Sequence, residues 1–116
     1  MLTPLVLPVQ RLATVAAGVA FLAGQYAADC PAAPIAVQAR NALDRLDGIL
    51  PTIGSTRDRL LWVLVYLADI ARDREGFTRV WNDWIAGRAA PSLTMVQVGL
   101  AAPEYRVVVL ATAAVD

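Results

Sequence analysis

The side chains in this sequence that could take part in chemistry are one cysteine, ten carboxylates and ten arginines, because histidine and lysine are both absent. There is therefore no imidazole to act as a general base and no amine to form a Schiff base. Cys30 has no histidine to activate its thiol, so we interpret it as a loop thiol rather than a nucleophile. One cysteine and scattered carboxylates argue against a zinc or copper site, so we expect no metal site.

The other polar candidates lie close to apolar segments. Asp69 follows the run LLWVLVYLA and could act as an acid or a base, but we favour hydrogen bonding to the local backbone. Arg88 and Arg106 could reach a cleft from its rim, although a solvated arginine is the simpler interpretation of each. Tyr26 and Thr94 are the uncharged polar side chains that we place most readily beside a cleft.

Three tryptophans could form an aromatic cage around a ligand. Trp81 and Trp84 belong to an i, i+3, i+4, i+7, i+8 apolar stripe that begins at Phe77, so we assign both to the core of the domain. Trp62 lies in an apolar run with the composition of a strand, and it could instead line a cleft.

Length and charge limit the class of protein. The 116 residues predict a single domain over 1–116, and zero net charge without a basic patch argues against a nucleic-acid partner. The apolar segment Leu12–Ala23 is too short to span a membrane and contains Gly18. We interpret it as a β-hairpin turning at Ala17-Gly18 rather than as a signal peptide, and we expect no membrane association. The lone cysteine leaves no internal disulfide, which fits a cytoplasmic location.

Hydrophobic periodicity predicts seven elements in the order β-β-α-β-α-β-β, which is an α+β two-layer domain. They are a hairpin within Val9–Gln25, a helix from Ile35 to about Pro51, a strand over Leu60–Ala68, a helix from an N-cap at Asp73 to Gly87, and strands over Leu93–Gly99 and Tyr105–Thr112. Two helices can cover only one face of the sheet, yet LLWVLVYLA and RVVVLATA are apolar at both odd and even positions. The sequence therefore predicts that another copy of the chain covers the second face.

Five strings, in order, resemble the RidA family, also called YjgF/YER057c/UK114 or endoribonuclease L-PSP-like. FLAGQ is similar to the family's strand that ends in Ser-Gly-Gln, and AVQARNALDRLDGILPTIGST is similar to its first helix. RLLWVLVYLADI, GFTRVWNDWIAG and VQVGLAAPEYRVVVLATA are similar to its third strand, second helix and final hairpin. The resemblance implies a chorismate-mutase-like fold, with a mixed sheet and two helices on one face. It also implies a homotrimer with clefts between subunits, and cofactor-independent hydrolysis of enamines and imines to 2-oxo acids.

Two charged positions of the family are apolar in this chain. The family's Pro-Ala-Arg-Ser/Thr corresponds to 91–94, so Leu93 occupies the place of the arginine that grips the substrate carboxylate. The family's Val-Glu-Ile-Glu corresponds to 107–110, so Leu110 occupies the place of the glutamate that positions water. Val108 replaces the other acidic residue. Neither carboxylate binding nor ordinary imine hydrolysis is therefore expected.

The family positions predict a cleft between subunits that is walled by Leu93, Met95 and Leu110, with Thr94 and the backbone amides near Gly24 as its polar groups. The resemblance adds Gln25 beside Gly24, and places the family's N-terminal tyrosine at Val9 or Gln10. Further candidates for the cleft are Tyr26, Trp62, Arg88 and Arg106.

Three hypotheses about function follow from these residues. The first is a divergent member that binds or converts a small, largely apolar and uncharged molecule in the intersubunit cleft. The second is a non-catalytic trimeric scaffold or partner protein. The third is an enamine or imine deaminase that uses a different substrate and a different group to hold it.

Overall fold

The computed structural model describes residues 12–115 of the chain and contains the seven predicted elements in the predicted order. Two short 3₁₀ turns, Leu50–Ile53 and Arg57–Arg59, precede the third strand. The helices and strands are β1 (Ala13–Ala16), β2 (Val19–Tyr26), α1 (Ile35–Ile49), β3 (Leu60–Leu67), α2 (Ile70–Ile85), β4 (Ser92–Gln97) and β5 (Val107–Ala114).

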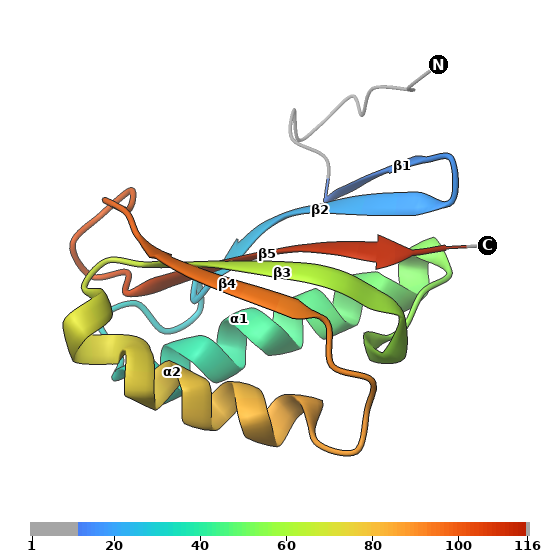
Figure 1. The fold of residues 1–116 in the computed structure, drawn as a ribbon. Coiled ribbons are helices and arrows are strands. Elements are labelled where there is room, and N and C mark those ends of the chain that lie inside the picture. The colour runs from blue at the N-terminus through green and yellow to red at the C-terminus, as the bar shows by residue number, and fades with distance from the viewer. Residues whose placement is uncertain (1–11, 116) are drawn as a thin grey trace.

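The strands form one mixed sheet in the order β1-β2-β5-β3-β4, and both helices pack on the same face of it (Figure 1). β3 and β4 are parallel, while the other neighbouring strands are antiparallel. A parallel pair needs a long crossover connection, and α2 supplies it. These features confirm the α+β two-layer fold.

The first two strands form the predicted hairpin. Ala17 and Gly18 both have positive φ, 51° and 78°, between the paired residues Ala16 and Val19. Positive φ at both central residues of a two-residue turn matches the right-handed twist of the strands. The interpretation of 12–23 as a hairpin is therefore confirmed, whereas Val9 and Gln10 lie outside the described residues.

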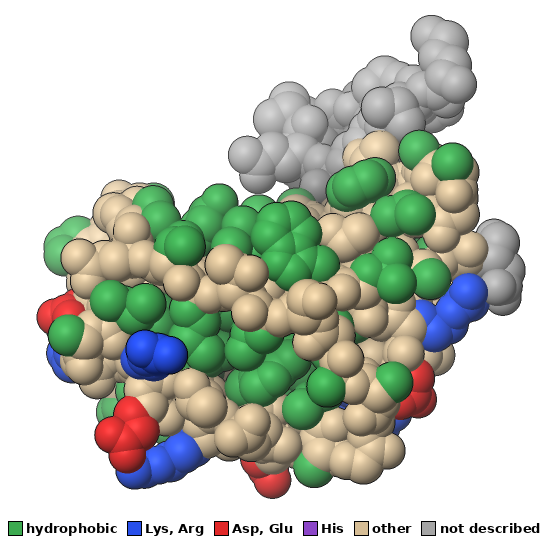
Figure 2. Space-filling view, in the orientation of Figure 1, with side chains coloured by type: hydrophobic (Ala, Val, Ile, Leu, Met, Phe, Trp, Pro, Cys, Tyr) green, Lys and Arg blue, Asp and Glu red, His purple; other side chains and the backbone are tan. Residues whose placement is uncertain are grey.

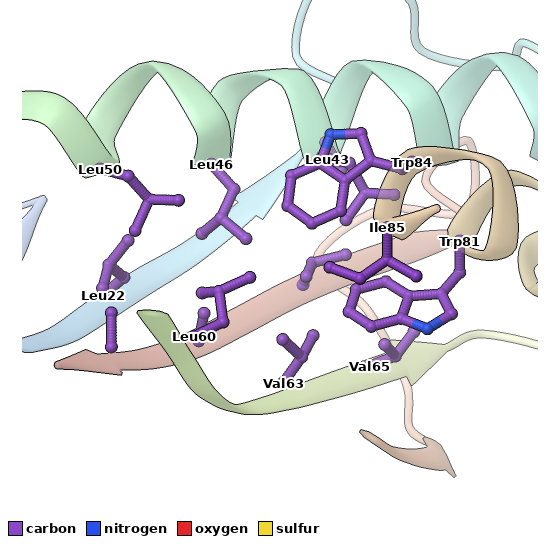
Figure 3. Close-up of a cluster of buried hydrophobic side chains, with 14 of the residues drawn as sticks. Leu22, Leu43, Leu46, Leu50, Leu60, Val63, Val65, Trp81, Trp84 and Ile85 are labelled. Carbon is purple, nitrogen blue, oxygen red and sulfur yellow. The ribbon is translucent and has the colours of Figure 1, made fainter. Parts of the chain in front are cut away.

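The hydrophobic core fills the space between the helices and the inner face of the sheet (Figure 3). Trp81 and Trp84 are 5% and 2% exposed, which confirms that these tryptophans belong to the core rather than to a ligand cage. They meet apolar side chains of α1, β3 and β5, including Leu43, Leu46, Val63, Val65 and Val109. The helical spacing of the apolar residues dictates this packing, because it places them on one side of each helix.

The second helix begins at Ile70, one turn earlier than predicted. Asp69 has extended backbone angles and its side chain accepts a hydrogen bond from the Arg72 backbone N–H at 3.0 Å, as an N-cap does. The prediction of Asp73 as the cap was wrong, because Asp73 lies within the helix and is buried. The N-cap is Asp69, and its hydrogen bond to the local backbone is the interaction that we expected for it. At the other end, Gly87 has a φ of 76°, the left-handed conformation of a helix end.

The outer face of the sheet carries large apolar side chains that neither helix covers. Phe21 and Trp62 are 54% and 44% exposed, and Leu64 and Leu110 are half-buried beside them. Figure 2 shows hydrophobic side chains along the sheet side of the molecule. Large apolar side chains exposed together on one face are typical of a region that contacts a partner.

Candidate functional site

The edge strand β4 directs alternate side chains to opposite faces of the sheet. Leu93 and Met95 are half-buried and pack against the core, whereas Ser92, Thr94 and Val96 are exposed on the outer face. The parallel register places Leu93 and Met95 beside buried residues of β3. Both residues were predicted to line a cleft, and both face the helix layer at the open edge of the sheet.

A hollow of about 400 Å³ lies between β4 and α2. Figure 2 shows hydrophobic side chains exposed between these two elements, with a basic side chain at the margin. Leu93 and Met95 form the strand side of this hollow, while Ile70, Arg74 and Thr78 form the helix side. The three helix residues are spaced i, i+4, i+8 and therefore lie in one row along α2.

Arg74 is the charged member of this row, and it was not among the predicted site residues. Its neighbour Glu75 forms an ion pair with Arg79, one turn further along the helix. No carboxylate is found within ion-pair distance of Arg74 in the described part of the chain. The four-residue spacing of Ile70, Arg74 and Thr78 would have indicated a shared helix face. It could not be used, because the helix was predicted to begin only after Asp73.

Gly24 and Gln25 lie where β2 and β5 change register, between Leu22 and Gln25. A Cβ atom at Gly24 would come within 2.8 Å of Val108 Cγ1 and 3.5 Å of Leu110 Cγ, so close packing of the outer face requires a glycine there. Gln25 is 9% exposed, and its Nε2 donates a hydrogen bond to the carbonyl of Ala23 at 3.1 Å. Both residues therefore have local structural roles.

A second, smaller hollow of about 200 Å³ lies on the outer face of the sheet. Trp62 lines it, and the Trp62 indole N–H donates a hydrogen bond to Thr94 Oγ1 at 3.2 Å. The other residues that line it are Phe21, Leu22, Leu64, Leu110, Ala111 and Thr112. The structure thus groups Trp62, Thr94 and Leu110 on the outer face.

The predicted wall of Leu93, Met95 and Leu110 does not form within one chain. Leu93 and Met95 face the helix layer, while Leu110 faces away from it. A cleft lined by all three side chains would have to take Leu110 from a different copy of the chain. Thr94 and Gly24 likewise lie on the outer face, away from the hollow beside α2.

Arg106 is held by the fold and does not reach a cleft as a free group. Its Nη2 and Nε lie 2.8 and 3.1 Å from the two oxygens of Asp73, and Arg72 also donates to that carboxylate. Burial acts to raise the pKa of Asp73, but the hydrogen bonds from Arg72 and Arg106 outweigh it, so the pKa is lowered. Arg88 Nη1 lies 3.5 Å from Asp58 Oδ2 at the surface, as we expected of a solvated arginine.

The remaining candidates are dispersed. Tyr26 is exposed on the outer face and meets Tyr105 edge to face, with ring centroids 5.0 Å apart. Cys30 is a free, half-buried thiol in the loop before α1. Residues 12–115 contain no group of three or more cysteines or carboxylates that could hold a metal ion. Within the same residues, no helix is long and apolar enough to cross a membrane.

Comparison with known proteins identifies the relatives of this chain. The family model "Endoribonuclease L-PSP" matches residues 8–115. A RutC family protein of Haemophilus ducreyi is 31% identical over 99 residues, which are 85% of this chain and 83% of that protein. The RutC family protein YoaB of Escherichia coli K12 is 33% identical over 78 residues, which are 67% of this chain and 68% of YoaB.

Solved structures agree with the sequence relatives. NMB1025 of Neisseria meningitidis, described as a member of the YjgF protein family, is 30% identical and superimposes with a TM-score of 0.86 over 94% of this chain and 89% of its own. Rv2704 of Mycobacterium tuberculosis, described as a YjgF/YER057c/UK114 member, is 30% identical with a TM-score of 0.78, covering 90% of this chain and 85% of its own. The chain therefore belongs to the endoribonuclease L-PSP family, which is the RidA (YjgF/YER057c/UK114) family that its sequence resembles.

Proposed function

We propose that this chain forms a homotrimer that binds or converts a small, largely apolar molecule in clefts between its subunits, without the ordinary imine deaminase activity. The observation that carries this proposal is the hollow beside the open edge strand β4, where Leu93 and Met95 provide an apolar wall. By the family resemblance, Leu93 occupies the position of an arginine that binds the substrate carboxylate. An apolar wall at that position gains free energy by burying apolar ligand surface, at about 25 cal/mol per Å².

The outer face of the sheet supports assembly. Phe21, Trp62 and Val96 are exposed on it, and they come from three different strands of one continuous sheet. Removing this surface from water favours association of identical copies, and closed symmetry gives each copy the same contacts. In such a trimer the outer-face residue Leu110 of one subunit could approach the β4 edge of the next. That approach would bring Leu110 together with Leu93, as the family positions suggest.

The loss of charge at both family positions supports the absence of ordinary deaminase activity. Leu110 has no oxygen with which to position a water molecule, and Leu93 has no donor for a carboxylate. Thr78 offers a hydroxyl in the hollow, but that hydroxyl donates to the carbonyl of Arg74 at 2.8 Å. We further propose a cytoplasmic location and no nucleic-acid partner, on the basis of the lone cysteine and the zero net charge.

The test measures assembly and ligand binding in the same samples. Light scattering at micromolar concentration gives the solution mass, and ligand-observed NMR follows titration with 4-phenylbutanamide, a neutral probe with an apolar body. We expect a trimer that binds the probe saturably. Met95→Trp should fill the hollow and weaken binding, while Val37→Trp, at an exposed site on α1, should not. A folded monomer, or a trimer that binds no probe, would contradict the proposal, and the latter result would favour a non-catalytic scaffold.

A further inference from the structure

We infer that Arg74 of α2 is the anion-binding group of the hollow beside β4, so that the ligand is an amphipathic acid with an apolar body and one carboxylate. The inference rests on the proposed function, because it takes this hollow as the ligand site. It also replaces the expectation of an uncharged ligand, which followed from Leu93 alone. The positive charge lies on the opposite wall, on the helix rather than on the strand.

The placement of Arg74 gives the hollow one charged side and one apolar side. Ile70, Arg74 and Thr78 lie in one row along α2, with Arg74 at the centre of the row. Leu93 and Met95 face this row from β4. A ligand that bridges the hollow would therefore place its apolar part against the strand and its polar end against the helix.

The other charges near Arg74 already have partners. Arg79 pairs with Glu75, and Arg72 donates two hydrogen bonds to the buried Asp73, at 2.8 and 3.1 Å. Asp69 accepts a hydrogen bond from backbone at the start of α2. Over residues 12–115 no carboxylate pairs with the Arg74 guanidinium. Its donors are thus available to a ligand without the cost of breaking an internal ion pair.

The donor geometry of arginine specifies the class of ligand. A guanidinium presents a planar fork of N–H groups that matches the two oxygens of a carboxylate. Arg74 also lines an adjoining hollow along α2, with Ala71, Glu75 and Arg79. Its flexible stem can therefore place the guanidinium at the mouth of the hollow, where a carboxylate keeps part of its hydration while the apolar body is buried.

The experiment compares 4-phenylbutanoate with 4-phenylbutanamide, which share one apolar body and differ in charge. Wild-type protein should bind the acid roughly tenfold more tightly than the amide, as expected for a charge-assisted hydrogen bond. Arg74→Gln should reduce this preference to about twofold or less. The readout is the ratio of the two affinities within each protein, because the loss of the Arg74 stem from the hollow affects the acid and the amide alike. Arg40→Gln, which removes the same charge from an exposed site on α1, should keep the preference. Acetate alone should not bind detectably, because it has no apolar body to bury.

The outcomes separate this inference from the proposed function. Equal binding of acid and amide by wild type, or a preference for the acid that survives Arg74→Gln, would overturn the role of Arg74 and leave the apolar cleft intact. Binding of neither probe would overturn both. A preference lost equally in Arg74→Gln and Arg40→Gln would show an effect of net charge, and it would also overturn the specific role of Arg74.

Discussion

Arg106 and Asp73 form a two-point ion pair that joins the residue before β5 to the first turn of α2, with N–O distances of 2.8 and 3.1 Å. The Asp73 side chain is 1% exposed, so its charge depends on these arginine donors in place of water. The buried Gln38 of α1 reinforces the junction, since its Oε1 accepts from the Arg106 backbone N–H at 2.8 Å. One buried carboxylate therefore connects both layers of the domain.

Asp73→Asn should destabilise the protein by about 2 kcal/mol, because Arg106 and Arg72 would lose a charged acceptor in a partly buried position. Urea denaturation followed by circular dichroism measures the change in the free energy of unfolding. Asp83→Asn removes an exposed carboxylate that pairs with Arg40 and should change stability by about 0.5 kcal/mol or less. Equal effects of the two substitutions would contradict the structural role assigned to Asp73.

The stability of the protein should fall as the pH is lowered through the acid range. The pKa of Asp73 is lowered in the folded protein, so its contribution is complete above the ordinary unfolded pKa of about 4 and is lost as the pH falls through the folded pKa. Hydrogen bonds from Arg57 lower the pKa of Asp47 in the same direction. Urea titrations from pH 7 to pH 3 should show a weaker pH dependence for Asp73→Asn than for wild type. An identical dependence would mean that Asp73 is not the group responsible.

Phe21→Glu should convert the proposed trimer into smaller species, since it places a charge at an exposed apolar site on the outer face. Light scattering should report a mass near that of one 12.4 kDa chain in place of a threefold larger mass. Val37→Glu changes a similarly exposed apolar residue on α1 and should leave the mass unchanged. A trimeric Phe21→Glu variant would show that the subunits associate through another surface.

The wild-type protein should not accelerate the loss of small amino-acid-derived imines, because Leu93 and Leu110 cannot supply the two charged groups of the family. An amino-acid oxidase generates the imine, and semicarbazide traps what remains. Leu93→Arg should increase the affinity for 4-phenylbutanoate, by roughly tenfold, since it adds a guanidinium to the wall opposite Arg74. It should not restore turnover, because Leu110 still offers no oxygen to water. Rapid imine loss with wild-type protein would show that another group performs the hydrolysis.

Gly24→Ala should destabilise the fold by about 1–2 kcal/mol, because the added methyl group would approach Val108 Cγ1 too closely. The Val108→Ala change removes that atom, so the double variant should recover most of the loss beyond the cost of Val108→Ala alone. Thermal unfolding of wild type, the two single variants and the double variant gives the coupling free energy between the two sites. Additive effects would mean that the close approach is relieved by movement of the backbone.

The order of the elements could be predicted from the sequence because each long element carries a strong local pattern. The 3.6-residue spacing places Trp81 and Trp84 on the core side of α2, and the structure confirms that position. The start of α2 could not be predicted as well, because Asp69 and Asp73 are both plausible caps and only the tertiary fold shows that Asp73 pairs with Arg106.

The candidate site was less predictable than the fold, since it depends on which face each strand residue occupies. The alternation in β4 separates Leu93 from Thr94, but it does not say which of them faces the helices until the register with β3 is known. Arg74 could not be singled out for a related reason. Nothing in the sequence distinguishes Arg74 from any other arginine on a helix. It becomes a candidate only because the structure places Leu93 and Met95 across the hollow from it.

The position of β5 has a consequence for how the chain folds as it is synthesised. β5 follows every other strand in the sequence, yet it lies at the centre of the sheet between β2 and β3 (Figure 1). Until it leaves the ribosome, the β1–β2 hairpin and the β3–β4 pair each have an open edge and cannot join. Their union depends on contacts between distant parts of the chain, which form late and slowly. The nascent chain should therefore depend on chaperones for longer than a chain whose strands pair in sequential order.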